Sequence, residues 1–395
     1  MTVQYRIPQH WISFDFQKVQ ELLVEAKASI QSLRTVPYQK SWAKSLQEIE
    51  LKREIAGTSK IEGADFTDNE LNEALKESPE ELLTRSQRQA HAAVRTYKWI
   101  ASISDDIPIN DALIFNIHSK LVVGADDDHC APGKLRTKDQ NVTFGIPRHR
   151  GAEGGNECKT AFSSLINAIN STFKNHDPLI QAFAAHYHFA AIHPFLDGNG
   201  RTARALEALF LQRIGLRDTV FISMSNYYYD EKNKYLSTMS DVRQNSYDLT
   251  SFIQFGLKGV ISQTKRLLTE IQKHIQKGLY RNLMYDLFNR LMSTRKRVIA
   301  ERQVEILNIL LEHESYNMWK LYKLVEKNYI NLKNSQNAYI RDLIGLMNLQ
   351  CVKLSKEEDS VIVNIVLEWP SNITESEFFE MVKQLPKAKT HPFLT

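Results

Sequence analysis

One stretch of the chain, from His193 to Arg204, combines the residue types that phosphate chemistry needs; its sequence is HPFLDGNGRTAR. His193 supplies an imidazole that can take up a proton near neutral pH. Asp197 supplies a carboxylate suited to a divalent cation. Arg201 and Arg204 are three residues apart, so on a helix they share a face. We therefore interpret this stretch as a site for phosphate transfer.

The same stretch is expected to be a loop that runs into a helix. Pro194 stiffens the backbone beside the histidine, and Gly198-Asn199-Gly200 predict a sharp turn with bare backbone N–H groups. Apolar residues then recur at helical spacing until Gly215, and these are Ala203, Leu206, Leu209, Phe210 and Ile214. A helix N-terminus behind such a turn attracts anions, because its unpaired N–H groups and its dipole both favour negative charge.

A largely apolar run from Pro178 to Ile192 predicts a buried helix that leads directly to His193. Within it, His186 and His188 suggest a zinc site at first sight. Two residues apart, however, they point about 200° apart around the helix and cannot share an ion. We interpret both as structural.

The stretch from His193 to Arg204 resembles the signature of the Fic domain, His-x-Phe-x-[Asp/Glu]-Gly-Asn-Gly-Arg-x-x-Arg, at every defined position. Fic enzymes mostly transfer AMP from ATP to a hydroxyl side chain of a target protein, with Mg²⁺. The resemblance implies a mainly α protein, namely a Fic-fold helical bundle with a short β-hairpin flap. It also implies that pyrophosphate leaves after attack at the α-phosphorus.

The resemblance assigns roles along the signature. His193 is the expected general base, Asp197 the expected Mg²⁺ ligand, and Phe195 a core residue that anchors the loop. Arg204 is expected to hold the ATP γ-phosphate. The remaining expected nucleotide-binding residues are Gly198, Asn199, Gly200, Arg201 and Thr202.

An acidic residue far upstream, Glu62, is the second candidate for function. A predicted helix ends near Gly63, which places Glu62 in its last turn, where a negative charge opposes the helix dipole and gains from a cationic partner. Thr58, one turn earlier, can orient the carboxylate. An isolated acid of this kind is most often simply solvated.

The segment from Thr58 to Gly63 resembles the Fic inhibitory motif, [Ser/Thr]-x-x-x-Glu-[Gly/Asn]. In that class the glutamate pairs with the second signature arginine, here Arg204, and keeps the γ-phosphate from docking productively. In some relatives the same glutamate supports removal of AMP. Whether Glu62 does so stays open.

Two further segments are compared with the family. Val142, Thr143 and Phe144 lie in a predicted β-hairpin, where Fic proteins have a flap that pairs with a target segment by strand addition; an ordinary surface hairpin is the alternative. Tyr229 and Tyr235 follow the signature where Fic proteins enclose the adenine, although such tyrosines commonly serve core packing.

The chain is expected to divide into an N-terminal helical region (1–105), a catalytic domain (106–265), a basic helical connector (266–300) and a C-terminal domain (301–395). In the last, three predicted helices and a β-hairpin resemble a winged helix-turn-helix. Its third helix offers few positive charges, and the hairpin tip, Lys-Glu-Glu-Asp, is acidic and repels phosphate. DNA binding, protein docking and homodimerisation all stay open.

Composition adds modest limits. A net charge of +4 over 395 residues does not by itself imply a nucleic-acid partner. Three scattered cysteines predict free thiols in a reducing compartment. With no signal-like N-terminus or long apolar run, we expect a cytoplasmic protein without a membrane partner. Residues 126–129, Asp-Asp-Asp-His, are interpreted as a polar loop rather than a metal cluster.

The sequence therefore favours a self-inhibited protein adenylyltransferase that uses ATP and Mg²⁺ to modify an unidentified target protein and itself. A DNA-binding regulator with a nucleotide-sensing Fic domain is the alternative. A Fic transferase with another nucleotide donor is a third hypothesis.

Overall fold

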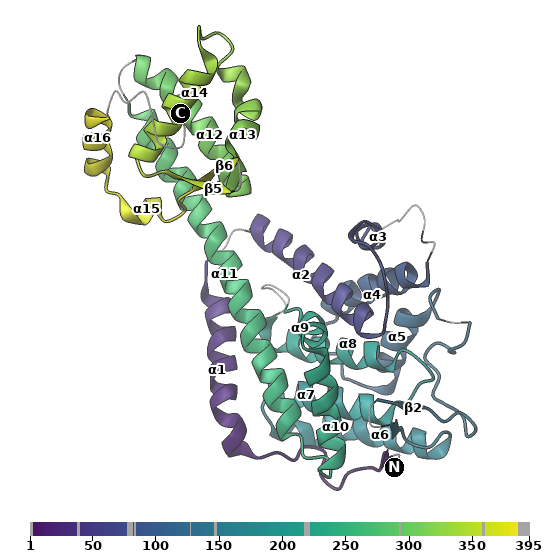
Figure 1. The fold of residues 1–395 in the computed structure, drawn as a ribbon. Helices are drawn as coiled ribbons and strands as arrows, with labels where there is room; N and C mark the ends of the chain where they lie inside the picture. Colours follow the sequence, from purple (N-terminus) through teal and green to yellow (C-terminus); the bar gives the residue numbers. More distant parts are fainter. Residues whose placement is uncertain are drawn as a thin grey trace. The chain divides into compact units, whose positions relative to one another are not determined.

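The computed structural model describes residues 3–37, 40–76, 82, 84–126, 128–145, 148–216, 222–291, 294–357 and 360–385. It is mainly helical, in agreement with the predicted fold class (Figure 1). The chain forms two compact units, Met1–Thr269 and Glu270–Thr395. The expected N-terminal region and catalytic domain thus lie in one unit, while the ends at 105, 265 and 300 stay predictions.

Helices make up most of the first unit. In chain order they are α1 (Phe16–Thr35), α2 (Lys40–Ile61), α3 (Asp68–Ala74), α4 (Arg85–Ser102), α5 (Asp111–Val122), α6 (Asn156–Asn170), α7 (Pro178–Ile192), α8 (Asn199–Leu211), α9 (Met224–Asp230), α10 (Lys232–Gln244) and the first half of α11 (Thr250–Asn289). A 3₁₀ turn (Thr172–Asn175) precedes α7, and a π-helical turn (Gln212–Leu216) follows α8.

The core of this unit is built around α7, whose residues from Leu179 to Ile192 are nearly all buried. Asp177 caps its N-terminus by accepting from the Leu179 N–H, and Pro178 occupies the first turn, where a missing N–H costs nothing. Helix α8 packs along α7. The buried helix predicted to lead to the signature is therefore present.

A small sheet lies beside these helices. Its strand order is β1-β3-β2, with β1 (Val3–Gln4) parallel and β2 (Thr143–Phe144) antiparallel to β3 (His149–Arg150). The predicted hairpin is thus present, joined by an N-terminal strand that the sequence did not suggest. Strand β2 is at the edge of this sheet among the described residues; Ile146 and Pro147 lie outside them.

Helix α2 is held by polar residues four positions apart along its buried face. Buried Glu50 pairs with Arg266 on α11, and buried Glu54 accepts from Tyr97 on α4 and Ser225 on α9. Thr58 continues the same row toward α8. Figure 1 shows α2 crossing the unit beside α4 and α9. This row points the C-terminal end of α2 at the signature.

The second unit contains the remaining elements. They are the rest of α11, α12 (Thr294–His313), β4 (Ser315–Asn317), α13 (Met318–Val325), a 3₁₀ turn (Glu326–Asn328), α14 (Ser335–Asn348), β5 (Val352–Glu357), β6 (Ser360–Ile365), α15 (Trp369–Asn372) and α16 (Glu375–Gln384). The predicted three helices and hairpin are present, and β4 adds a third strand beside β6. The winged-helix assignment stays a prediction; part of the acidic tip, 358–359, lies outside the described residues.

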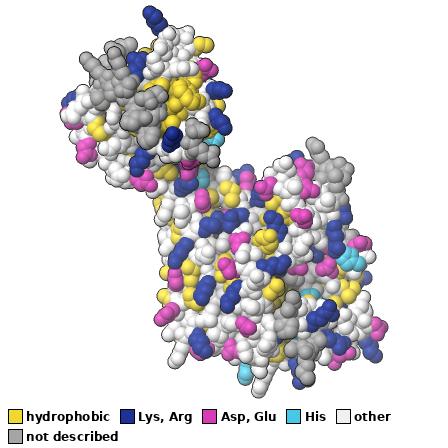
Figure 2. Space-filling model, viewed as in Figure 1, with side chains coloured by type: hydrophobic (Ala, Val, Ile, Leu, Met, Phe, Trp, Pro, Cys, Tyr) yellow, Lys and Arg dark blue, Asp and Glu magenta, His cyan; other side chains and the backbone are white. Residues whose placement is uncertain are grey.

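The structure can be compared with three expectations from composition, which concern the cysteines, the net charge and membrane-spanning segments. Cys130, Cys158 and Cys351 are unpaired and buried, as expected for free thiols. Figure 2 shows Lys and Arg interspersed with Asp and Glu over the visible face of each unit, as a net charge of +4 suggests. Among the described residues, no helix combines the length and apolar character that a membrane span requires.

We predict that Gly57→Ala loosens α2. A Cβ at this buried position would overlap the backbone of Ser225 at the start of α9. Alanine raises helix propensity, which alone would stabilise the helix. Instead we expect the free energy of unfolding to fall by about 1–3 kcal/mol, measured by denaturant titration.

Ser45→Ala, on an exposed position of α2, is the control and should leave the transition unchanged. An unchanged or higher midpoint for Gly57→Ala would show that α2 and α9 do not need this close approach.

Candidate active site

The junction between α7 and α8 has an unusual backbone that presents His193. This residue ends α7 in the left-handed region at φ 54°, and Gly198 opens α8 at φ 72°. A Cβ on Gly198 would come within 2.9 Å of the Val122 side chain, so glycine is needed there for space as well as conformation. The loop therefore turns sharply from the core helix into the N-terminus of α8.

Two side chains fix the loop from inside. Asn199 accepts from the Phe195 N–H at 2.9 Å and donates to the Phe195 carbonyl at 2.8 Å. The Phe195 ring is fully buried and stacks on His118 at 3.7 Å between ring centroids. Phe195 thus anchors the loop in the core, as expected. Asn199 is committed to the loop backbone through its side chain, which leaves its backbone N–H for a ligand.

The His193 ring is oriented as a base. Its Nδ1 lies 3.1 Å from the Ala190 carbonyl, which can only accept, so Nδ1 carries the proton and Nε2 keeps a free lone pair. The ring stacks on Phe144 of β2 at 3.9 Å between centroids. Burial lowers the pKa of His193 to about 4. At neutral pH the ring is therefore uncharged and able to accept a proton.

The N-terminus of α8 is an open anion site. Gly198 has no side chain to cap it, so the first N–H groups of the helix lack a capping partner. Buried Arg201 lies beside them, and its Nη1 donates to Asp126 at 2.6 Å. The Nε of Arg201 is buried and has no hydrogen-bond partner among the described residues. Helix dipole, free N–H groups and this spare donor all favour a negatively charged ligand.

Arg204, one turn along α8, is held by the end of α2. Its Nη2 donates to Glu62 Oε1 at 2.6 Å, its Nε to the Thr58 hydroxyl at 2.9 Å, and Nη2 also to the Thr58 carbonyl at 3.2 Å. Sequence reasoning expected Thr58 to orient the Glu62 carboxylate. The structure instead places the Thr58 hydroxyl on Arg204, so that Thr58 orients the cation of the pair.

The Glu62 carboxylate occupies part of the anion site. A Cβ on Gly200 would overlap Glu62 Oε1, so the absence of a side chain lets the carboxylate reach the α8 backbone. Burial alone would raise the pKa of Glu62, but Arg204 and Arg201 together hold it below the ordinary value. Glu62 keeps 37% of its side chain exposed, so the pair is partly screened by solvent.

Asp197 lies at the mouth of the site in a charged cluster. Ligand atoms of Asp126, His129 and Asp197 lie within 4.8 Å of one another. The Arg85 guanidinium from α4 is set against all three, with contacts of 3.3 Å to Asp197, 2.6 Å to Asp126 and 2.8 Å to His129. The described residues of this segment, 126, 128 and 129, lie in turns, as the interpretation of a polar loop expects, and within it Asp126 is fully buried and paired.

The tyrosines expected to enclose adenine are placed differently. Tyr235 is only 4% exposed; its ring stacks on Tyr228 at 4.8 Å, and its hydroxyl bonds to His186 Nε2 at 2.9 Å. Its role here is core packing, the alternative considered for it, because its faces are covered. Tyr229 is 39% exposed, with Lys60 Nζ 5.7 Å from its ring centre. It alone of the two presents a surface to a ligand.

The two buried histidines of α7 are structural, as expected. His186 bonds to buried Glu207 and to Tyr235, which ties α7 to α8 and α10. His188 bonds to the Trp11 carbonyl at 2.6 Å on the opposite side of the helix. They do not face a common ligand.

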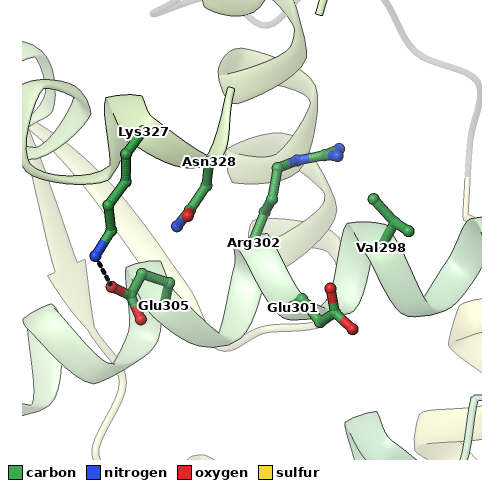
Figure 3. Close-up of a pocket in the computed structure, with 6 residues that line it drawn as sticks. All are labelled: Val298, Glu301, Arg302, Glu305, Lys327 and Asn328. Atoms are coloured by element: carbon green, nitrogen blue, oxygen red, sulfur yellow. Dashed lines mark ion pairs between the residues drawn. The ribbon is translucent and has the colours of Figure 1, made fainter. Parts of the chain in front are cut away.

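The second unit has a cavity of about 310 Å³, shown in Figure 3. It is lined by Val298, Glu301, Arg302, Glu305, Lys327 and Asn328. Its cations are already paired: Lys327 lies 3.5 Å from Glu305, and Arg302 lies 2.7 Å from Asp342. With these charges satisfied, and with all signature residues in the first unit, we assign the cavity no catalytic role.

Sequence reasoning missed several residues that support the site. Asp126 anchors Arg201, and Arg85 covers Asp197. Arg136 binds the backbone around His193, and Glu54 anchors α2. Only Glu54 had a sequence signal, since it continues the four-residue spacing of Thr58 and Glu62. The partners of the others are distant in sequence.

Part of the chain is similar in sequence to known proteins. Residues 108–211 match the Fic/DOC family. Protein adenylyltransferase Fic of Nematostella vectensis is 38% identical over 160 residues, which cover 38% of this chain and 32% of that protein. Protein adenylyltransferase fic-1 of Caenorhabditis elegans is 37% identical over 112 residues, 28% of this chain and 20% of that protein. The chain thus spans a third or less of these two curated relatives.

Solved structures agree in fold. A Fic family protein from Desulfovibrio desulfuricans G20 superimposes with a TM-score of 0.58 at 16% identity, over 92% of this chain and 98% of that one. Residues 134–508 of Fic-1 from C. elegans give a TM-score of 0.53 at 17% identity, over 65% of this chain and 73% of that one. At these identities the likeness concerns the fold.

We predict that α2 docks more weakly as the pH rises, because of Glu54. Burial raises its pKa to about 7, against hydrogen bonds from Ser225 and Tyr97 that lower it. Glu54 is therefore protonated when docked and ionised when released over the window from about pH 4.5 to 7. Its contribution is complete below this window and is lost as the pH rises through 7.

The raised pKa of Glu54 corresponds to a loss of about 3 kcal/mol at most in the free energy of α2 docking above pH 7. Hydrogen exchange of α2 should accelerate between pH 5.5 and 8 beyond the intrinsic chemical rate, and Glu54→Gln should reduce that excess. Burial also raises the pKa of Glu50 on the same helix, so part of the trend remains. Glu62 stays ionised throughout this range because its pKa is lowered, so it adds no trend. Equal pH trends in wild type and Glu54→Gln would contradict the assignment.

Proposed function

Residues 108–211 form a Fic domain, and on that premise we propose that this protein is a self-inhibited adenylyltransferase that transfers AMP from ATP to a hydroxyl side chain of a target protein. One observation carries the proposal. The Glu62 carboxylate lies against Gly200 and Arg204, at the anion site of the α7–α8 junction that also carries the His193 base. A built-in anion there is what an inhibited phosphate site requires.

The reaction that fits this geometry is attack of a hydroxyl oxygen on the α-phosphorus of ATP. The hydroxyl proton passes to Nε2 of His193, whose Nδ1–H is held by the Ala190 carbonyl. A new oxygen–phosphorus bond forms while the bond to pyrophosphate breaks. The residues act by positioning and charge stabilisation, as is general for this chemistry.

The nucleotide phosphates would bind the N–H groups at the start of α8 and the Arg201 side chain. Arg201 is suited to this because its Nε is buried and spare among the described residues. Thr202 contributes to the fold rather than the ligand, since its hydroxyl donates to the Gly198 carbonyl at 2.8 Å. Tyr229, which is partly exposed, is the tyrosine we retain as a candidate for contact with the adenine of ATP.

Mg²⁺ fits the residues at the mouth of the site. Asp197 offers a carboxylate that is 37% exposed, and Asp126 and His129 have ligand atoms close to it. Oxygen ligands suit Mg²⁺, so Asp197 would hold the ion. When bound, the ion supplies positive charge to the nucleotide phosphates. Arg85 and the ion would then compete for Asp197, because both cations interact with the same carboxylate.

Self-inhibition follows from the competition for Arg204. While its Nη2 is bonded to Glu62, that donor is not available to a γ-phosphate. The carboxylate also repels phosphate at the same place. Release of the end of α2 would remove both obstacles. Whether Glu62 also assists removal of AMP is tested by release of label from modified protein.

The target would reach His193 along the flap. Strand β2 is at the sheet edge, and its Phe144 already contacts the His193 ring. An extended segment paired with β2, which includes Thr143 and follows Val142, would bring its hydroxyl beside the base. The target protein is unidentified, and this chain's own hydroxyl residues are candidates. The second unit is proposed as a winged-helix docking module.

We predict that Glu62→Gly activates the protein. Loss of the carboxylate frees Arg204 and the α8 N-terminus for phosphate, so AMP incorporation from α-labelled ATP with Mg²⁺ should rise by about 10-fold or more, corresponding to at least 1.4 kcal/mol. Adding His193→Ala should abolish the label, since no base remains. Self-modification is measured first.

Glu48→Gly is the matched control, because Glu48 is exposed on the same helix. It introduces the same flexible residue without touching Arg204. A folded Glu62→Gly that binds ATP yet incorporates no AMP into itself or a lysate would argue against AMP transfer and direct attention to other nucleotide donors.

We predict that Arg85→Ala strengthens divalent cation binding. Removing the guanidinium leaves Asp197 and Asp126 with less positive charge nearby, which favours a metal ion. Mn²⁺ titration followed by electron paramagnetic resonance should show about 10-fold tighter binding without nucleotide. Arg95→Ala, exposed on the same helix, should match wild type. Unchanged or weaker Mn²⁺ binding in Arg85→Ala would refute the competition.

A further inference from the structure

Arg136 is a buried cation whose hydrogen bonds all go to backbone carbonyls. Its side chain is 2% exposed, among the largest fully buried side chains described. Nε donates to the His193 carbonyl at 2.8 Å, and Nη1 donates to the Gln140 carbonyl at 2.7 Å. Nη2 donates to Ala152 at 2.5 Å and to Ile192 at 3.4 Å.

We propose that Arg136 is a positioning residue for the transfer reaction, which clamps the backbone of His193 to both ends of the flap so that base and flap keep one geometry. This inference rests on the function proposed above. Gln140 precedes β2 and Ala152 follows β3, so the two bonded carbonyls mark the two stems of the hairpin. A single guanidinium thereby joins three chain segments.

The electrostatics explain why a buried charge is stable there. The Ile192 and His193 carbonyls are at the C-terminus of α7, where unpaired carbonyls and the helix dipole favour a cation. Further carbonyls from the flap stems complete the coordination. A planar guanidinium spreads five N–H donors over three nitrogens and so reaches carbonyls on separate segments, whereas a lysine ammonium has three donors on a single nitrogen and cannot reach all of them.

Backbone hydrogen bonds join the same segments around the Arg136 side chain. The Arg136 N–H donates to the Pro194 carbonyl at 3.0 Å, and the Ala152 N–H donates to the Ile192 carbonyl at 3.0 Å. Gly151 lies so close that a Cβ would be 2.7 Å from the Ile192 carbonyl and 3.2 Å from Arg136 Nη2. The flap stem and the end of α7 are thus in direct contact around the guanidinium.

The consequence concerns the alignment of base and target. His193 is in a left-handed conformation that its surroundings must maintain, and its ring packs on Phe144 of the flap. Without Arg136, the flap stems and the His193 carbonyl lose their common partner. The hydroxyl presented by the flap would then be misaligned with Nε2, whereas the nucleotide site on α8 keeps its own residues.

The test compares Arg136→Gln, Arg136→Lys and the control Lys134→Met in the Glu62→Gly background. Lys134 is exposed in the same segment. We expect Arg136→Gln to lower kcat for AMP transfer by about 100-fold, with ATP affinity within threefold and with faster hydrogen exchange in residues 140–152. Arg136→Lys should recover part of the rate, and Lys134→Met should match its parent.

A purely structural role predicts a different result. Arg136→Gln would then weaken ATP binding and transfer together, or accelerate exchange across α7 and α8 as much as in the flap, and either outcome would overturn the proposal. So would an undiminished rate. If Arg136→Gln does not fold, the same readouts on Arg136→Lys decide.

Failure of the proposed function is separable. If Glu62→Gly itself transfers no AMP, two other measurements still test the role of Arg136. They are hydrogen exchange of the flap and the reactivity of His193 toward diethylpyrocarbonate. Faster flap exchange and altered His193 reactivity in Arg136→Gln, absent in Lys134→Met, would support the clamp. No change in either would refute it.

Discussion

The positive end of α8 is the feature on which the rest of the site depends. Its first N–H groups have no capping side chain, and Arg201 and Arg204 add two buried guanidinium groups within one turn. So much positive charge in a buried place requires an anion. In this structure Asp126 balances Arg201, and Glu62 balances Arg204. The first partner is fully buried in the core, whereas the second is partly exposed just beyond the end of α2.

The two acidic partners of the α8 arginines differ in how firmly the fold holds them. Asp126 is fully buried and shared among Arg85, Gln89 and Arg201, so it ties the start of α8 to its surroundings. Glu62 lies just beyond the end of α2, partly exposed. The positive charge at the start of α8 is therefore balanced by one buried carboxylate, Asp126, and by one partly exposed carboxylate, Glu62. In the proposed reaction, an incoming phosphate would take the place of Glu62 without disturbing Asp126.

How much could be predicted from sequence depended on the distance between partners. The turn from His193 to Arg204 was predictable because all its groups are consecutive, and glycine spacing dictates the backbone there. The Glu62–Arg204 pair spans 142 positions and was predictable only through resemblance to a known motif. The contacts of Arg85 and Arg136 had no local pattern, because their partners come from separate loops. Tyr235 failed as a ligand residue because sequence cannot tell a tyrosine stacked in a core from one at a surface. The merging of residues 1–269 into one unit depended equally on tertiary packing.

The polar face of α2 has a thermodynamic consequence. Glu50, Glu54 and Thr58 contribute hydrogen bonds and charge where a typical docked helix would bury aliphatic side chains. Exposure of apolar surface raises the heat capacity, and exposure of polar surface lowers it. Detachment of this helix should therefore be accompanied by a small heat-capacity change. The equilibrium between its docked and detached states would then follow a nearly straight van 't Hoff line, whose slope is the enthalpy of breaking these polar contacts.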